Sequence, residues 1–165
     1  MSTLRVNNMT NVGGTASTYA PGHIVQVVQW RRPATEGSGQ GTLLVTNSSS
    51  FSTFMSASIV PKFSTSKILV NVSFYVYNGS TTASSGESRI LRDATYIDGL
   101  TYSSSYNLGN TFIGSHMSVL DSPNTTSQIT YNVQGMKSSG NTLQFGYADS
   151  GGTEHASITL MEVAV

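Results

Sequence analysis

A two-residue alternation of apolar and polar side chains runs through Lys67-Ile-Leu-Val-Asn-Val-Ser-Phe-Tyr-Val-Tyr-Asn78. One set of alternate positions is entirely apolar, at Ile68, Val70, Val72, Phe74 and Val76. Successive side chains of a β-strand point to opposite faces, so this pattern predicts a long strand with one face in a hydrophobic core. The other face ends in Tyr75 and Tyr77, whose amphipathic rings suit a half-buried contact.

Apolar residues recur at period two elsewhere in the chain, and no segment shows the 3.6-residue period of a helix. Further strands are expected at residues 24–30, 42–46, 51–59, 87–93, 111–120, 127–134, 142–147 and 158–163. In the first of these, Ile24, Val28 and Trp30 fall on one face and Val25 and Val27 on the other. Apolar residues on both faces predict a strand that is covered on both sides.

Turn-forming residues separate these segments, among them Asn78-Gly-Ser80, Asp98-Gly99 and Ser138-Ser-Gly-Asn141. Many short strands with frequent turns are typical of an antiparallel sandwich. We therefore predict an all-β fold, a jelly-roll-like β-sandwich head over residues 23–165. Residues 1–22 are rich in Asn and Gly, which predicts an extended N-terminal arm that buries little apolar surface by itself.

The composition excludes several functions. Charged residues make up 10% of the chain and balance to zero, so no basic surface is available for nucleic acid. Ser and Thr outnumber them by about three to one, which suits the outer faces of strands. The absence of cysteine excludes disulfides and thiolate chemistry. No apolar run reaches membrane-spanning length, and the first residues lack the apolar core of a secretory signal, which predicts synthesis in a cytoplasm without a signal peptide.

Four stretches are spread along nearly the whole length of the chain: Leu4-Arg-Val-Asn-Asn-Met-Thr-Asn-Val-Gly-Gly14, Gly22-His-Ile-Val-Gln-Val-Val-Gln29, Pro61-Lys-Phe-Ser-Thr-Ser-Lys-Ile-Leu-Val70, and Asp121-Ser-Pro123 through Val133 together with Ser157-Ile-Thr-Leu-Met-Glu-Val163. In this order they resemble the receptor-binding modules of bacteriophage tail fibres. The resemblance implies a small β-sandwich built into a virion, usually as a homotrimer and without a cofactor. The chain has neither the repeats nor the heptads of a fibre shaft, so it is expected to be short: an arm followed by a head.

The resemblance to tail fibres predicts which residues contact other virion proteins, other copies of the chain and the host surface. The arm would dock on other virion proteins through Leu4, Arg5, Val6, Met9 and Val12. Tyr75 and Tyr77 are predicted contacts of the homotrimer, because aromatic residues on a second strand face need more cover than one thin sandwich gives. Host-surface binding is predicted for an aromatic, hydroxyl-rich region at Tyr96, Tyr102, Tyr106 and Phe112, since aromatic faces stack on sugar rings. Packing of these rings in a core or between subunits is the competing interpretation.

Catalysis is not expected. The chain has no Gly-x-Ser-x-Gly motif, and Gly114-Ser115-His116 falls inside a predicted strand rather than at a strand-to-helix turn. A glycosidase would need a pair of carboxylates from Glu36, Glu87, Asp93, Asp98, Asp149 and Glu154. His23, His116 and His155 are too far apart in sequence to form a metal-ligand motif, so no metal is expected.

Tail and capsid locations both remain open at the level of the sequence. A capsid decoration protein would also combine an arm with a β-sandwich head. A small carbohydrate-binding or sugar-degrading module is the third alternative.

Overall fold

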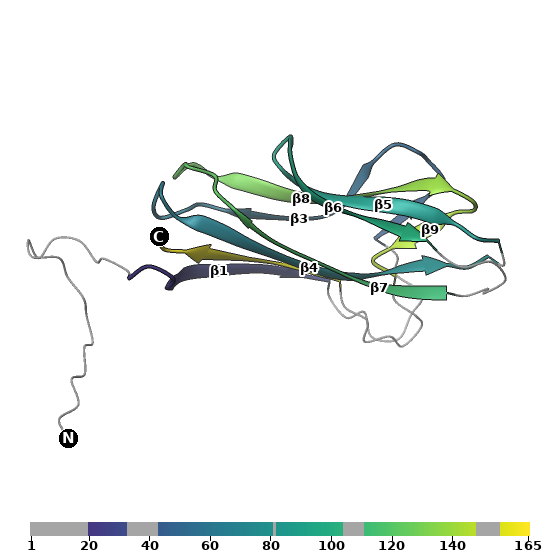
Figure 1. Cartoon of the computed structure of the whole chain (residues 1–165), viewed down its shortest axis with the longest axis horizontal. Helices are drawn as coiled ribbons and strands as arrows, with labels where there is room; N and C mark the ends of the chain where they lie inside the picture. Colours follow the sequence, from purple (N-terminus) through teal and green to yellow (C-terminus); the bar gives the residue numbers. More distant parts are fainter. Residues whose placement is uncertain (1–19, 33–42, 81, 104–110, 148–155) are drawn as a thin grey trace, which may run out of the picture.

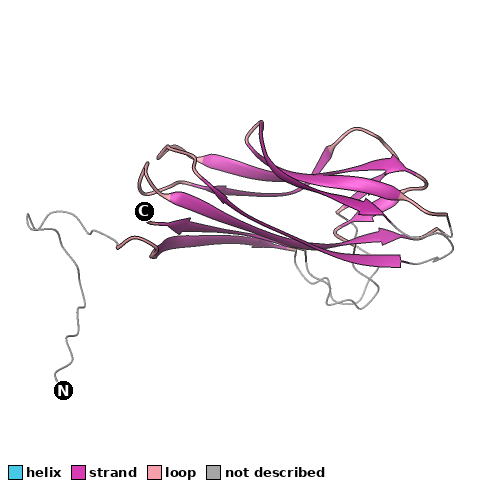
Figure 2. Cartoon of the chain, viewed as in Figure 1, coloured by secondary structure: helices cyan, strands magenta, loops and turns pink. Residues whose placement is uncertain are grey.

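The computed structural model describes residues 20–32, 43–80, 82–103, 111–147 and 156–165. Within these ranges the chain forms ten β-strands and no helix, as the two-residue periodicity predicts (Figure 2). No helix that could span a membrane occurs in this part of the chain. The strands are β1 (Ile24–Arg31), β2 (Leu44–Thr46), β3 (Ser52–Ile59), β4 (Lys67–Asn78), β5 (Ser85–Arg92), β6 (Thr95–Ser103), β7 (Thr111–Asp121), β8 (Ile129–Ser139), β9 (Leu143–Phe145) and β10 (Ser157–Val163).

The strands form two antiparallel sheets that lie one above the other (Figure 1). The four-stranded sheet has the order β3-β8-β5-β6. In the six-stranded sheet β1 pairs with β10, β10 with β4, and β4 with β7. Leaving aside the short β2 and β9, four strands in each sheet follow the connectivity of a jelly roll, with eight strands and two Greek keys. The predicted jelly-roll-like sandwich is therefore confirmed.

The short strands β2 and β9 lengthen one end of the six-stranded sheet. β10 pairs with β4 from Lys67 to Ser73, and β9 takes over the same edge of β4 at Val76 and Tyr77. β2 then pairs with β9. The predicted strand at 142–147 is shorter than expected, but Leu143, Phe145 and Tyr147 are all buried, as their alternation indicates.

The hydrophobic core lies between the two sheets. All five apolar residues of the predicted inner face of β4 are at most 1% exposed: Ile68, Val70, Val72, Phe74 and Val76. Phe74 packs edge-on against Phe54 of β3, with ring centroids 5.1 Å apart. Phe145 of β9 also contacts Phe54, at 5.4 Å. These contacts join the sheets and bury the large side chains that dominate a core's stability.

Within one chain, β1 is not covered on both sides, contrary to the prediction. β1 lies at the edge of its sheet, and a bulge between Ile24 and Gln26 changes the side to which Ile24 points. Ile24 is 55% exposed and Val27 54% exposed, whereas Val28 and Trp30 pack against the core. Ile24 and Val27 therefore lie on the outside of the sandwich.

A second correction concerns Asp98-Gly99, which was predicted as a turn. Both residues lie inside β6, and the turn that joins β5 to β6 is formed at Asp93 instead. Asp93 adopts a left-handed backbone with φ of 51°, which Asp tolerates better than most residues. Its backbone N–H donates to the Thr130 carbonyl at 2.7 Å, so β8 holds the turn in place.

Backbone hydrogen bonds connect Gly22, at the end of the predicted arm, and the adjacent His23 to the residue after β10. The Gly22 N–H donates to the Ala164 carbonyl at 2.8 Å, and the Ala164 N–H donates to the His23 carbonyl at 2.9 Å. These bonds extend the pairing between β1 and β10. Residues 1–19 of the arm, including Leu4, Arg5, Val6, Met9 and Val12, lie outside the described residues.

Candidate functional site

The predicted host-binding residues are distributed over both sheets. Tyr96 lies on β6 and is 61% exposed. Phe112 lies on β7, in the other sheet, and is 44% exposed. Tyr102 belongs to β6, but its side chain is outside the described part of the chain, as is the whole of Tyr106. Tyr96 and Phe112 therefore lie on two different sheets and do not form one binding surface.

The first surface is a groove on the outer face of the four-stranded sheet. We call it the Arg89 groove, and its walls include Phe51, Glu87, Arg89, Tyr96, Gly99 and Thr101. Its volume is about 240 Å³. Neighbouring strands bring the groove together, because Arg89 of β5 is paired with both Gln134 of β8 and Gly99 of β6. Of its members, the sequence-based prediction included only Tyr96 among the binding residues.

The second surface is the outer face of the six-stranded sheet. The backbone register aligns Val27, Met161, Leu69 and Leu120 in one row across four strands. Val27 and Leu120 are 54% and 50% exposed. The next row contains only uncharged polar residues, at Gln29, Thr159, Asn71 and Ser118. We call these two rows the interaction face.

Aromatic rings gather on the same sheet where β9 meets β4. Tyr77 stacks on Tyr147 with ring centroids 4.2 Å apart, and Phe112 contacts both rings at 4.8 and 5.4 Å. Tyr75, one of the two predicted trimer contacts, lies two residues before Tyr77 and is 38% exposed. Phe112 therefore belongs with Tyr77, which favours a packing role for it over sugar binding.

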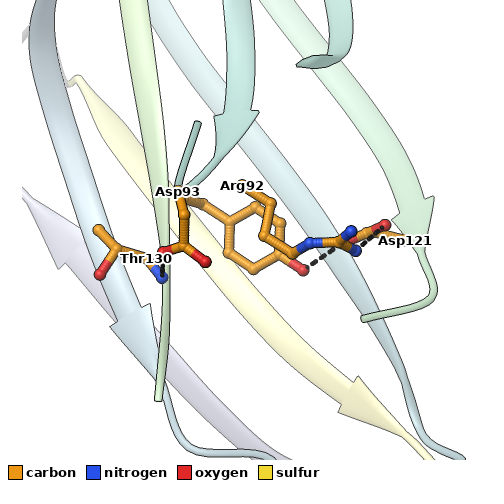
Figure 3. Close-up of polar contacts among 5 residues, drawn as sticks. Arg92, Asp93, Asp121 and Thr130 are labelled. Carbon is orange, nitrogen blue, oxygen red and sulfur yellow. Dashed lines mark hydrogen bonds and ion pairs between the residues drawn. The ribbon is translucent and has the colours of Figure 1, made fainter. Parts of the chain in front are cut away.

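A polar clasp joins the two sheets at the opposite end of β4. The Arg92 Nη1 of β5 donates to both oxygens of Asp121, at 2.8 and 2.7 Å (Figure 3). The Tyr131 hydroxyl of β8 donates to the same carboxylate at 2.6 Å. Burial of the phenol and its hydrogen bond to Asp121 raise the pKa of Tyr131 far above its ordinary value. The clasp is consistent with a structural role, because its groups are already paired with one another.

A second buried carboxylate, Glu162 of β10, holds the loop between β3 and β4. It is fully buried and accepts from the backbone N–H groups of Lys62 and Phe63 at 2.8 and 3.1 Å. The Gln26 side-chain amide adds a third bond at 2.6 Å. Burial opposes ionisation, but the bonds from Lys62, Gln26 and Phe63 outweigh it and lower the pKa of Glu162 below its ordinary value.

The carboxylates considered for glycoside hydrolysis have other roles where the structure describes them. The Asp93 carboxylate accepts from the Thr130 N–H at 3.0 Å (Figure 3), and the Asp98 carboxylate accepts from the Gly99 N–H at 2.8 Å. Glu87 lines the Arg89 groove. Glu36, Asp149 and Glu154 lie outside the described residues.

No group of three or more potential metal ligands occurs among the described residues. His23 and His116 are exposed, the first just before β1 and the second on β7, and His155 lies outside the described part of the chain.

The strand order places the chain among antiparallel jelly-roll β-sandwich proteins. A scan against protein-family models finds no match, and a search of curated proteins finds none either. Among solved structures, the chain is similar to one described as infectious bursal disease virus Gx strain, with a TM-score of 0.42 and 12% identity over 98% of this chain. The corresponding Gt strain structure gives a TM-score of 0.40 and 11% identity, also over 98%.

The VP2 subviral particle of the same virus gives a TM-score of 0.39 and 10% identity over 95% of this chain. The chain spans 42% to 43% of the length of these solved chains. A likeness at this level carries no inference about function, so the function proposed below rests on this chain's own residues.

Proposed function

We propose that the chain is a non-enzymatic structural protein of a virion: a short bacteriophage tail fibre that works as a homotrimer. Residues 1–22 form the arm that docks on the tail or baseplate, and the jelly-roll head contacts the host surface. The ordered sequence stretches that resemble tail-fibre modules support the virion assignment. The interaction face is the structural observation that carries the proposal, because it offers a surface for a second copy of the chain.

The chemistry of the interaction face suits contact between copies. Its two rows contain no charged residue, so copies can approach without repulsion or the cost of desolvating a charge. From the strand lengths, a rise of about 3.3 Å per residue and a spacing of about 4.8 Å, the whole outer face of the four strands covers roughly 600 Å², and the two uncharged rows lie within it. This is of the order of the ~800 Å² that each partner contributes to a standard stable interface.

A trimeric capsid decoration protein is the second candidate. The jelly-roll connectivity favours it as a distinct possibility, because this architecture is common in viral capsid domains. The same interaction face would serve such a trimer, and the arm would clamp neighbouring capsid subunits.

Electron microscopy of virions of the encoding bacteriophage, labelled with gold-conjugated antibody against this chain, separates the candidates. Gold at the tail end is the result expected for a short fibre, and antibody should then also reduce adsorption to host cells. Gold over the capsid contradicts the fibre and supports the decoration protein, whose loss should make capsids less resistant to heat. Virions that carry no gold, although the antibody recognises the purified chain, contradict a virion role.

A further inference from the structure

Gly99 lines the Arg89 groove, and the Tyr96 hydroxyl lies close above it. A Cβ atom at this position would lie 2.9 Å from the Ser88 carbonyl oxygen and 3.0 Å from the Tyr96 hydroxyl. A larger residue at position 99 would therefore displace Tyr96, which also lines the groove. Phe51 and Arg89 line it as well.

Arg89 is held in a fixed position across the sheet. Its guanidinium carbon lies 3.8 Å from the centroid of the Phe51 ring, and its Nε donates to the Gln134 side-chain oxygen at 2.9 Å. Gln134 is fixed in turn by donating to the Thr53 hydroxyl at 3.0 Å. No described residue accepts from the terminal amino groups of Arg89, so a planar pair of donors is available to a ligand.

Acceptors stand beside these donors. Glu87 lies two residues before Arg89 on the same strand face, and one of its oxygens accepts from the Ser138 hydroxyl at 3.2 Å. Its second oxygen has no donor among the described residues. Thr101 faces Glu87 across the β5–β6 pair, and the exposed ring of Tyr96 adds an aromatic surface with a hydroxyl. The groove thus combines hydrogen-bond donors, acceptors and an aromatic ring on two neighbouring strands, β5 and β6.

We infer that the Arg89 groove binds a neutral saccharide unit, with its ring against Tyr96 and adjacent hydroxyls shared between Arg89 and Glu87. Each sugar hydroxyl can both donate and accept a hydrogen bond. One hydroxyl can therefore accept from Arg89 while its neighbour donates to Glu87. An acidic sugar would meet the Glu87 carboxylate, whereas a neutral one meets a groove whose two charges cancel. Aromatic faces bind the apolar face of a sugar ring in the same way that they cover other apolar surface.

The size of the groove limits the ligand. Its volume of about 240 Å³ is below the roughly 300 Å³ at which pockets for drug-sized ligands begin. One sugar ring, or the terminal ring of a surface glycan, matches this size. For a ligand of that size we expect a dissociation constant on the order of millimolar per site, so tight attachment would need several heads together.

The inference rests on the proposed function only for the source of the saccharide, a host surface, and it is tested on the purified chain. Saturation-transfer NMR would be recorded with galactose, glucose, N-acetylglucosamine and rhamnose as neutral probes, and with glucuronic acid and N-acetylneuraminic acid as acidic ones. We expect millimolar binding of at least one neutral probe, little changed by added salt. Arg89→Ala and Tyr96→Ala should each weaken it by about tenfold or more.

The matched controls are Arg31→Ala and Tyr75→Ala, which remove the same side chains from exposed positions on the other sheet. They should change the dissociation constant by less than about twofold, a difference too small to indicate a lost contact. Circular dichroism and the urea midpoint verify that each variant is folded. The inference would be overturned if the two control variants weakened binding as much as Arg89→Ala and Tyr96→Ala do.

Two other results would also overturn it. One is no binding of any neutral probe at concentrations tenfold above the expected constant. The other is binding of the acidic probes alone with a steep loss in salt, because screening acts on charge and not on neutral hydroxyls. Neither result changes where gold labels the virion, so failure of the groove and failure of the proposed function are distinguishable.

Discussion

The Tyr131 hydroxyl donates to the Asp121 carboxylate at 2.6 Å, which joins the four-stranded sheet to the end of β7 in the other sheet. Arg92 neutralises the same carboxylate from β5. The contact links strands whose side chains otherwise meet only through the core. It therefore adds a polar link between the two sheets to the aromatic contacts of the core.

Replacing Tyr131 with Phe tests this clasp. The ring is 0% exposed and keeps its packing in the variant, so the change removes only the hydroxyl. A hydrogen bond to a charged group is worth about 1.5–3 kcal/mol, and we expect the free energy of unfolding to fall by that amount. Urea denaturation measures the change. Tyr75→Phe, at an exposed tyrosine, is the control and should be neutral; equal effects from both would show that the clasp adds nothing.

Glu162 is expected to make the free energy of unfolding of the head decrease at low pH. Its pKa is lowered in the folded chain, so its contribution is fully present above the unfolded value of about 4.5 and is lost as pH falls through the folded pKa. We expect the urea midpoint to decline below about pH 4.5 for this reason.

The Glu162→Gln variant separates this effect from other carboxylates. At pH 7 it should lose about 1–3 kcal/mol, because the N–H groups of Lys62 and Phe63 lose a charged acceptor. Its midpoint should then fall less steeply in acid than that of the wild type. Parallel pH curves for the two proteins would contradict the assignment of Glu162 as an acid-sensitive group.

Gly135 tests the packing between β8 and β9. A Cβ atom there would lie 2.9 Å from three atoms of the buried Phe145 ring. Gly135→Ala should therefore cost about 1–3 kcal/mol through overpacking.

Gly114→Ala is the matched control, since its Cβ would meet only a Tyr75 ring carbon at an ordinary 3.6 Å. A gain of up to about 1 kcal/mol is expected there, because alanine restricts the unfolded chain more than glycine does. Thermal unfolding of both variants measures the contrast, and a Gly135→Ala protein as stable as the wild type would rule out the close approach.

The sequence predicted strands best where alternation was unbroken. β4 has the expected bounds because its apolar face never changes sides between Lys67 and Asn78. Prediction was wrong at β1, where one bulge reverses the side of Ile24, a change that no period-two pattern contains. It was also wrong at Asp98-Gly99, where turn-forming residues continue a strand because β8 holds the turn at Asp93 instead.

Only part of the Arg89 groove could be predicted from the sequence. Tyr96 was expected as a binding residue, but Arg89 lies on β5 and Phe51 directly precedes β3, and these two strands are joined only through β8. Their contact depends on the sheet order, which strand patterns do not specify. The pairing of Arg89 with Gly99 was not predicted either, because the sequence indicated a turn at Asp98-Gly99.

Self-association through the interaction face is the central claim, and sedimentation equilibrium at micromolar concentration tests it most directly. We expect trimers for the wild type and a shift to monomer for Leu120→Ser, which places a polar group in the apolar row while the exposed position leaves folding nearly unchanged. Val60→Ser removes an apolar side chain that is 48% exposed in a loop, and it should remain trimeric. A wild-type chain that is only monomeric, or a Leu120→Ser variant as trimeric as the wild type, would contradict the account.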